Sequence, residues 1–169
     1  MMKILDSSPL ILFLDKIDEM DCLFILSTEI DELKLPKSVY KEFIDKGDNS
    51  ILDELIDDGT LDIIGGISVQ EEKQIRSRWP NLGMGEINVL AWAERLKKNE
   101  TDFVCVLDDS NARKACELMG FPLTGSLGLL KILKINGFLS PSRIIEIVDK
   151  IKNSDFRIKD NILEDLLNV

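Results

Sequence analysis

The stretch Phe103-Val-Cys-Val-Leu-Asp108-Asp109 decides the fold class of this chain. Its apolar residues run without alternation, which is typical of a central strand in a parallel sheet that is covered on both faces. Strand-like and helix-like segments alternate before and after it. Because a strand, a helix and a further strand form a right-handed parallel unit, we expect an α/β fold. The expected architecture is a three-layer α/β/α domain around a central, mostly parallel sheet of about four to five strands.

Short apolar runs define the predicted strands. They cover Met2–Leu5, Leu23–Leu26, Leu61–Ile64, Phe103–Leu107 and Pro122–Thr124. Apolar residues at helical spacing, together with glycine and proline as end signals, define the predicted helices. They cover Leu10–Ile17, Pro36–Asp45, Asn49–Asp58, Gln70–Trp79, Met84–Lys97, Ala112–Met119, Ser126–Ile135, Pro141–Ile151 and Asp160–Leu167. Ser8 with Pro9 is expected to cap and start the first helix.

The length of 169 residues fits one domain with a real core. We expect residues 1–169 to form a single domain, with its core in about residues 2–140 and a C-terminal helical segment in about residues 141–169. Ile162, Leu163, Leu166 and Leu167 would be costly to expose together. This segment should therefore pack on its own domain or on a second copy of the chain.

The composition is that of an ordinary globular protein, with 44% apolar residues and a mean hydropathy of +0.02. The apolar runs are far shorter than the roughly 18 residues of a membrane span. Asp6 and Pro9 interrupt the start of the chain, where a signal peptide needs a continuous apolar stretch. We expect a cytoplasmic location and no membrane contact.

Histidine is absent, and the three cysteines show no metal-ligand spacing. These two facts exclude Ser-His-Asp and Cys-His catalysis and the usual zinc sites. Acid–base or metal chemistry must therefore use carboxylates. The net charge of −10 argues against a general nucleic-acid coat, because such binding depends on Lys and Arg. A local site remains compatible with that charge, since divalent ions would reverse its sign.

Acidic residues from separate segments stand where an α/β fold would bring them together. The candidates are Asp6, Glu42, Glu86, Asp108 and Asp109. Each has an ordinary explanation when taken alone, as a turn residue, a solvated helix residue or a helix cap. Asp6 and Asp108, however, both follow strands, and ligands of open α/β sheets bind beyond the carboxyl ends of the strands. Clustered carboxylates repel one another unless a hard cation offsets them, so the set predicts a Mg²⁺ or Mn²⁺ site for phosphoryl transfer.

Asp108 and Asp109 have to be told apart. A helix needs one N-cap residue, which Asp109 or Ser110 can provide. That would leave Asp108 to face the crevice, but the sequence does not decide which of the two acids is the ligand.

The order of these motifs resembles the PIN-domain family, and specifically its small prokaryotic, VapC-related, DUF3368-like members. The resemblance spans roughly residues 2–140. It rests on Ile4-Leu-Asp6-Ser-Ser-Pro-Leu-Ile, Leu35-Pro-Lys-Ser-Val-Tyr-Lys-Glu42, Gly85-Glu86-Ile-Asn-Val-Leu-Ala-Trp-Ala, Val106-Leu-Asp108-Asp-Ser-Asn-Ala-Arg113-Lys-Ala and Thr124-Gly-Ser-Leu-Gly-Leu-Leu.

The resemblance implies a divalent-metal-dependent endoribonuclease that uses Mg²⁺ or Mn²⁺. The implied catalytic and metal-binding residues are Asp6, Glu42, Glu86 and Asp108, with Asp109 as an adjacent candidate ligand. It also implies RNA as the substrate, a toxin role in a toxin–antitoxin pair, an antitoxin protein as partner, and a homodimer.

Basic residues near these motifs are candidate phosphate contacts. They are Arg113, Lys131 and Lys134, for which a solvated helix face is an equally good explanation. The alternative function is a catalytically weak or inactive PIN-fold module that regulates through protein or RNA partners. A phosphorylatable receiver domain would need an acid pair near the first strand and a late Lys beside Pro, and the chain has neither.

Overall fold

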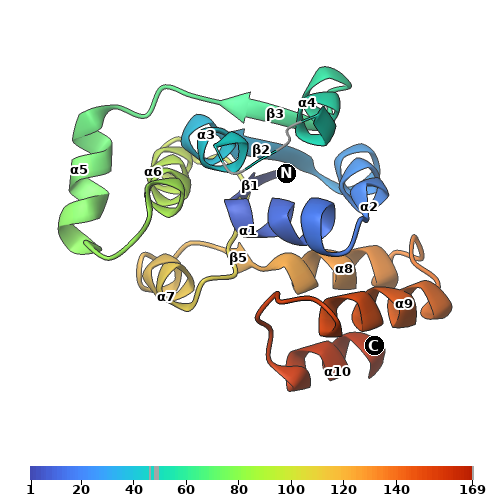
Figure 1. Cartoon of the computed structure of the whole chain (residues 1–169). Helices are drawn as coiled ribbons and strands as arrows, with labels where there is room; N and C mark the ends of the chain where they lie inside the picture. Colours follow the sequence, from blue (N-terminus) through green and yellow to red (C-terminus); the bar gives the residue numbers. More distant parts are fainter. Residues whose placement is uncertain (46, 48–49, 169) are drawn as a thin grey trace.

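The computed structural model describes residues 1–45, 47 and 50–168. Its strands form one parallel sheet in the order β3-β2-β1-β4-β5, and helices cover the sheet on both faces (Figure 1). The strands are β1 (Met2–Leu5), β2 (Glu32–Pro36), β3 (Leu61–Ile64), β4 (Phe103–Val106) and β5 (Leu123–Thr124). This arrangement confirms the predicted three-layer α/β/α fold.

One predicted strand is wrong and one observed strand was missed. Leu23–Leu26 was expected to be a strand but belongs to helix α2 (Met20–Ile25) and to the first residue of the π-helical stretch that follows it. Its apolar run buries Leu23 and Leu26 at helical spacing, whereas Phe24 between them is 48% exposed. Strand β2 was missed because it carries charged residues. Lys34 in its middle is partly buried and pairs with Asp62 of β3, at 2.6 Å, and with Glu32, at 2.8 Å.

The first helical segment is longer and more irregular than predicted. Helix α1 (Ser7–Leu10) begins directly after Asp6, so the predicted cap at Ser8 is wrong. It runs into a π-helical stretch, η1 (Ile11–Lys16), and α2 runs into a second one, η2 (Leu26–Ile30). The bond from Ile17 N to Leu12 O, at 3.0 Å, spans five residues, as a π-helix requires.

The remaining helices lie close to their predicted ranges. They are α3 (Lys37–Ile44), α4 (Ser50–Asp57), α5 (Val69–Arg78), α6 (Met84–Lys98), α7 (Ser110–Leu118), α8 (Ser126–Ile135), α9 (Pro141–Lys152) and α10 (Asp160–Asn168). The predicted start of the fourth helix at Asn49 lies outside the described residues. Among the described residues, none of the helices has the length and apolar character that a membrane crossing needs.

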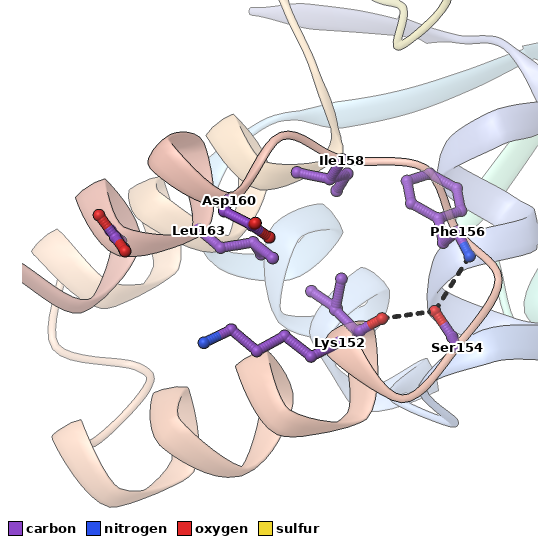
Figure 2. A pocket seen from close by; sticks show the side chains of 8 residues that line it. Lys152, Ser154, Phe156, Ile158, Asp160 and Leu163 are labelled. Carbon is purple, nitrogen blue, oxygen red and sulfur yellow. Dashed lines mark hydrogen bonds between the residues drawn. The ribbon is translucent and has the colours of Figure 1, made fainter.

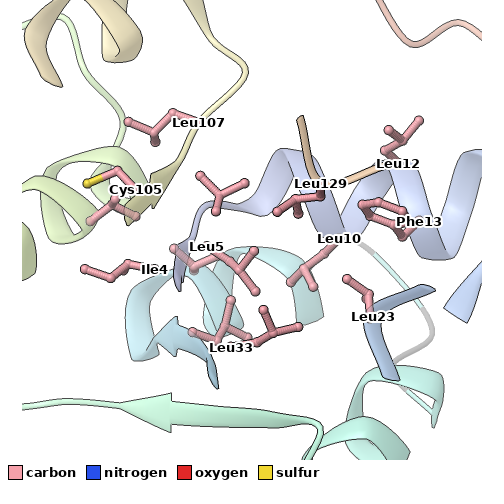
Figure 3. Packing of buried hydrophobic residues seen from close by; sticks show 14 of the residues in the cluster. Ile4, Leu5, Leu10, Leu12, Phe13, Leu23, Leu33, Cys105, Leu107 and Leu129 are labelled. Carbon is pink, nitrogen blue, oxygen red and sulfur yellow. The ribbon is translucent and has the colours of Figure 1, made fainter. Parts of the chain in front are cut away.

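The core is built from both sides of strand β1. Figure 3 shows Ile4 and Leu5 of β1 beside Leu33 of β2, with Leu10 and Leu129 from the helices packed nearby. All three cysteines are buried and free, as expected for thiols that act as small apolar side chains. Strand β1 lies in the middle of the sheet. Packed side chains therefore surround Asp6, the residue that follows this strand.

The C-terminal helices pack on the domain itself. Leu163 and Leu166 are buried, and Lys134 Nζ of α8 donates to the carbonyl oxygen of Leu166, at 2.8 Å. Figure 1 shows α10 and α9 stacked below α8, at the C-terminal end of the colour range. This confirms the first of the two predicted packing choices. Ile162 stays 43% exposed, and the expected homodimer remains a prediction.

Candidate functional site

The site lies where the connections of the sheet change direction. From β1 the chain builds outward through β2 to β3, then returns to place β4 on the other side of β1. Asp6 directly follows β1, and Asp108 comes two residues after the end of β4 at Val106, so both lie at the same edge of two neighbouring parallel strands. The backbone N–H of Asp6 donates to Val106 O at 3.2 Å. This is the switch point at which open α/β sheets bind their ligands.

Asp6 is an almost fully buried carboxyl, with 4% of its surface exposed. Burial raises its pKa to about 7, and the backbone amide of Ser7 offsets only part of that effect. The charges of Glu86, Glu42 and Asp108 raise the pKa further. Three of the acids that the sequence analysis selected therefore lie near enough to Asp6 for their charges to act on it.

Glu42 reaches this cluster from the end of helix α3. Its Oε1 accepts a hydrogen bond from the backbone N–H of Gly85, at 2.8 Å. Gly85 lies between two carboxylates: a methyl group placed on it would lie 2.7 Å from Glu42 Oε2 and 3.0 Å from Asp6 Oδ1. Only the absence of a side chain at this position lets the two oxygens come so close to one backbone.

Glu86 lies in the first turn of α6, next to Gly85. Its Oε2 accepts the backbone N–H of Gly83 at 2.8 Å, which satisfies one of the free amides at the helix start. Partial burial raises the pKa of Glu86, and the charges of Asp109 and Glu42 raise it further. Glu86 thus caps its own helix and also faces the cluster.

The structure separates Asp108 from Asp109. Asp109 caps α7, since its Oδ1 accepts the backbone N–H groups of Asn111 and Ala112, at 2.8 and 3.0 Å. Asp108 instead turns toward the start of α8, where its Oδ1 accepts the N–H of Ser126 at 2.8 Å and its Oδ2 accepts the Ser126 hydroxyl. The prediction that Asp109 can provide the cap is confirmed, and the role of Asp108 as a metal ligand stays a prediction.

Burial raises the pKa of Asp108, while the bonds from Ser126 and the charge of Arg113 act in the opposite direction. Gly125 allows this approach, because a methyl group there would lie 2.7 Å from Asp108 Oδ1. The sequence analysis missed the roles of Gly85, Gly125 and Ser126. A glycine inside the first turn of a helix, where alanine is favoured, was the signal available for Gly85.

The match of the chain to known families agrees with this geometry. Residues 2–169 match the family DUF3368, which is described as a PIN domain. The chain belongs to the PIN-domain family. No curated protein matches it. Membership gives the chain a nuclease-type fold and suggests interaction with nucleic acid, whereas the reaction and the cofactor remain to be proposed.

The donors of this PIN domain fit a hard divalent cation by their chemistry. All are carboxylate oxygens, which Mg²⁺ and Mn²⁺ prefer, and the space beside Gly85 is bounded by oxygens of Asp6 and Glu42. Across residues 1–45, 47 and 50–168, however, no three acidic or cysteine side chains converge as a ready cation site. The reason is visible in the bonds above: Glu42, Glu86 and Asp108 each bond to the chain, and like charges keep them apart.

The predicted phosphate contacts differ in their surroundings. Arg113 lies beside Asp108, but its Nη1 donates to Leu107 O at 2.8 Å and to Thr124 O at 3.2 Å. Lys134 is engaged at the end of α10, far along α8 from the acids, and Lys131 is exposed. The contacts of Arg113 and Lys134 are thus structural, and their role toward phosphates stays a prediction.

A pocket of about 480 Å³ lies elsewhere in the PIN domain, between α9 and α10 (Figure 2). It is lined by apolar side chains such as Phe156, Ile158 and Leu163 together with charged ones such as Lys152 and Asp160. None of the five candidate acids lines it. The acid cluster, and not this pocket, is therefore the candidate functional site.

Proposed function

We propose that this PIN-domain protein is a divalent-metal-dependent endoribonuclease, with Mg²⁺ or Mn²⁺ as cofactor and RNA as substrate. The observation that carries the proposal is the environment of Asp6. This carboxyl is buried at the switch point of the sheet, and the groups whose charges act on it are other carboxylates. A cluster of this kind is costly to the metal-free protein, and a hard cation with oxygen ligands offsets the cost.

In this proposal Asp6 and Asp108 are direct ligands. Glu42 and Glu86 complete the ligand set, directly or through water. When bound, Mg²⁺ or Mn²⁺ lowers the pKa of a coordinated water and offsets charge on the scissile phosphate.

The chain contributes the placement of the carboxylates. The start of α1 fixes Asp6, the N–H of Gly85 holds Glu42, and Ser126 holds Asp108. Asp109 is occupied with its helix cap and therefore belongs to the support of the site. These bonds fix where each carboxylate starts, and the oxygens still have to turn toward a bound cation because they do not converge without it.

The net charge of −10 restricts how RNA is held. Broad phosphate neutralisation is unfavourable on such a surface, so the cation itself supplies much of the attraction for one scissile phosphate. We propose single-stranded or structured RNA as the substrate class. As part of the same proposal, the protein acts as a toxin whose activity an antitoxin protein restrains.

A second candidate function is a PIN-fold binding or regulatory module without turnover. One observation favours it: Glu42, Glu86 and Asp108 are each bonded within the chain, and the described acids do not converge as a ready site. In that case the acid cluster would have no catalytic role, and RNA or protein binding would be independent of divalent ions.

Cleavage assays decide between the two functions. Purified protein is incubated with a panel of single-stranded and structured RNAs in Mn²⁺ or Mg²⁺, with and without EDTA. We expect products that EDTA abolishes and that Asp6→Asn and Asp108→Asn, purified in parallel, do not form. The parallel variants control for contaminating ribonuclease, since a contaminant would act in all three preparations. Metal-independent RNA binding without cleavage would support the second function.

A further inference from the structure

Gly85 occupies an unusual place for a glycine. It is buried in the first turn of α6, a 15-residue helix, and its φ is not in the left-handed region that would require glycine. Glycine is less favourable than alanine inside a helix by about 0.5–1 kcal/mol. Neither backbone conformation nor helix propensity explains its presence, so the explanation must lie in the space around it.

Side chains of the acid cluster occupy the space around Gly85. A methyl group on Gly85 would lie 2.7 Å from Glu42 Oε2, 3.0 Å from Asp6 Oδ1 and 3.2 Å from Val39 Cγ2. The first distance is shorter than a carbon–oxygen contact allows, so a side chain here would have to displace a carboxylate. At the same time the N–H of Gly85 holds the other oxygen of Glu42, at 2.8 Å.

We infer that Gly85 is a positioning residue of the acid cluster: its bare backbone sets how closely Asp6 and Glu42 approach one another and a bound divalent cation. This inference rests on the proposed function, because it assumes that the cluster binds a cation. Gly85 touches neither the substrate nor a reacting atom. It acts through Glu42, which it holds by its N–H, and through Asp6, whose oxygen it leaves room for.

Gly83 offers a matched comparison two residues away. A methyl group on Gly83 would have only one near neighbour, Glu86 Oε2 at 3.7 Å, which is an ordinary contact. Its φ of −67° suits alanine as well as glycine, and its N–H remains available to Glu86. Gly83→Ala therefore adds the same group at the start of the same helix without entering the space between the acids.

The test is a titration of each protein with Mn²⁺, in which the free ion is counted by electron paramagnetic resonance. The wild type and Gly83→Ala should bind Mn²⁺ with similar affinity. Gly85→Ala should bind it at least about tenfold more weakly, as changes behind metal ligands commonly do. The melting temperature in EDTA, measured alongside, should stay close to that of the wild type, because the groups that have to yield are the carboxylate ends of Glu42 and Asp6 and one methyl group of Val39.

A double variant separates the carboxylates from simple packing. In Val39→Ala with Gly85→Ala, the carbon contact is relieved while the contacts to Glu42 and Asp6 remain. Continued weak binding in this variant supports the inference. Recovery of wild-type affinity in the double variant, or wild-type affinity in Gly85→Ala itself, overturns it. If the wild type binds no Mn²⁺, the proposed function is wrong, and this inference is wrong as well because it rests on that function.

Discussion

Two buried carboxylates of this chain have opposite surroundings. Glu19 and Asp6 are 3% and 4% exposed, so each has lost nearly all contact with water. Glu19 Oε2 lies 2.6 Å from Arg143 Nη2, and its Oε1 lies 2.7 Å from Lys150 Nζ. Asp6 has other carboxylates as its charged neighbours. Among the described residues, the charged neighbours of Glu19 are thus cations and those of Asp6 are carboxylates.

Under the proposed function, this difference separates a structural acid, Glu19, from a metal-binding one, Asp6. Glu19 joins the turn after η1 to helix α9, and Lys150 adds a bond to Ile17 O at 2.9 Å. Burying a charge is tolerated when it is paired and hydrogen-bonded, and that description fits Glu19. Asp6 fits a group whose partner comes from outside the chain. The following predictions test this contrast, from the largest expected effect to the smallest.

The largest effect should come from removing the cations of Glu19. In Arg143→Met with Lys150→Met, a buried carboxylate is left without a partner, which costs about 3–5 kcal/mol of unfolding free energy. Urea unfolding measures the loss. Lys152→Met serves as the control because this lysine is exposed on the same helix, and we expect a change within about 0.5 kcal/mol. An equally small change in the double variant would show that the ion pairs are not structural.

A pH dependence should distinguish Asp6. Its pKa is about 7 in the fold and 3.8 in the unfolded chain, so between these values the folded protein holds a proton that the unfolded chain releases. The stability of metal-free wild type should therefore fall as pH rises from about 4 to about 7 and then level off. Asp6→Asn lacks this titration, so its advantage should grow over the same window, by on the order of a few kcal/mol.

Unfolding of both proteins in EDTA across this pH range measures that difference. Taking the difference between them cancels the titration of groups that the two proteins share. A constant difference, or an advantage of the wild type that grows with pH, would contradict the assignment of Asp6 as an uncompensated carboxyl.

Asp108 and Asp109 should respond in opposite ways to substitution. Asp109→Ala removes a helix cap and should cost about 1 kcal/mol without changing the response to Mn²⁺. Asp108→Asn should leave much of the stability in EDTA and lose most of that response. Thermal melts of both variants, with and without Mn²⁺, check this. The reverse pattern would exchange the roles of the two acids.

Lys134→Met should have the smallest effect. Its ammonium donates to the last carbonyl groups of α10, at Leu166 and Leu167, and such a contact at a helix end contributes about 0.3–1 kcal/mol. We expect that loss of stability and no change in RNA affinity, measured by filter binding. A clear fall in RNA affinity would restore Lys134 as a phosphate contact.

The sequence predicts the fold well where apolar pattern and end signals agree. Phe103–Val106 is a strand because it is apolar throughout, and Ser126–Ile135 is a helix with its predicted bounds. The sequence does not predict an element whose formation depends on contacts between distant segments. Strand β2 depends on Lys34 meeting Asp62 of the neighbouring strand, and no local pattern contains that contact. The sequence analysis likewise missed the π-helical stretches over Ile11–Lys16 and Leu26–Ile30.

The candidate site divides in the same way. The positions of Asp6 and Asp108 follow from the rule that parallel strands end at one edge, so the sequence could place them. Glu42 and Glu86 were also candidates from the expected arrangement, but a helical Glu is ordinary by itself, and their place in the ligand set rested on the resemblance. The contributions of Gly85 and Ser126 come from close approach of distant segments. Their importance is a matter of space and hydrogen bonds that only the folded chain shows.

The most direct test of the central claim is the shift in melting temperature caused by Mn²⁺ in three proteins: wild type, Asp6→Asn and Glu19→Gln. A ligand that binds only the folded state stabilises it by mass action. We expect a rise of several degrees for the wild type and for Glu19→Gln, although the latter starts from a lower melting temperature. Asp6→Asn should melt in EDTA at or above the wild-type temperature and show little rise. A full Mn²⁺ shift in Asp6→Asn, together with a loss of stability in EDTA, would contradict the account.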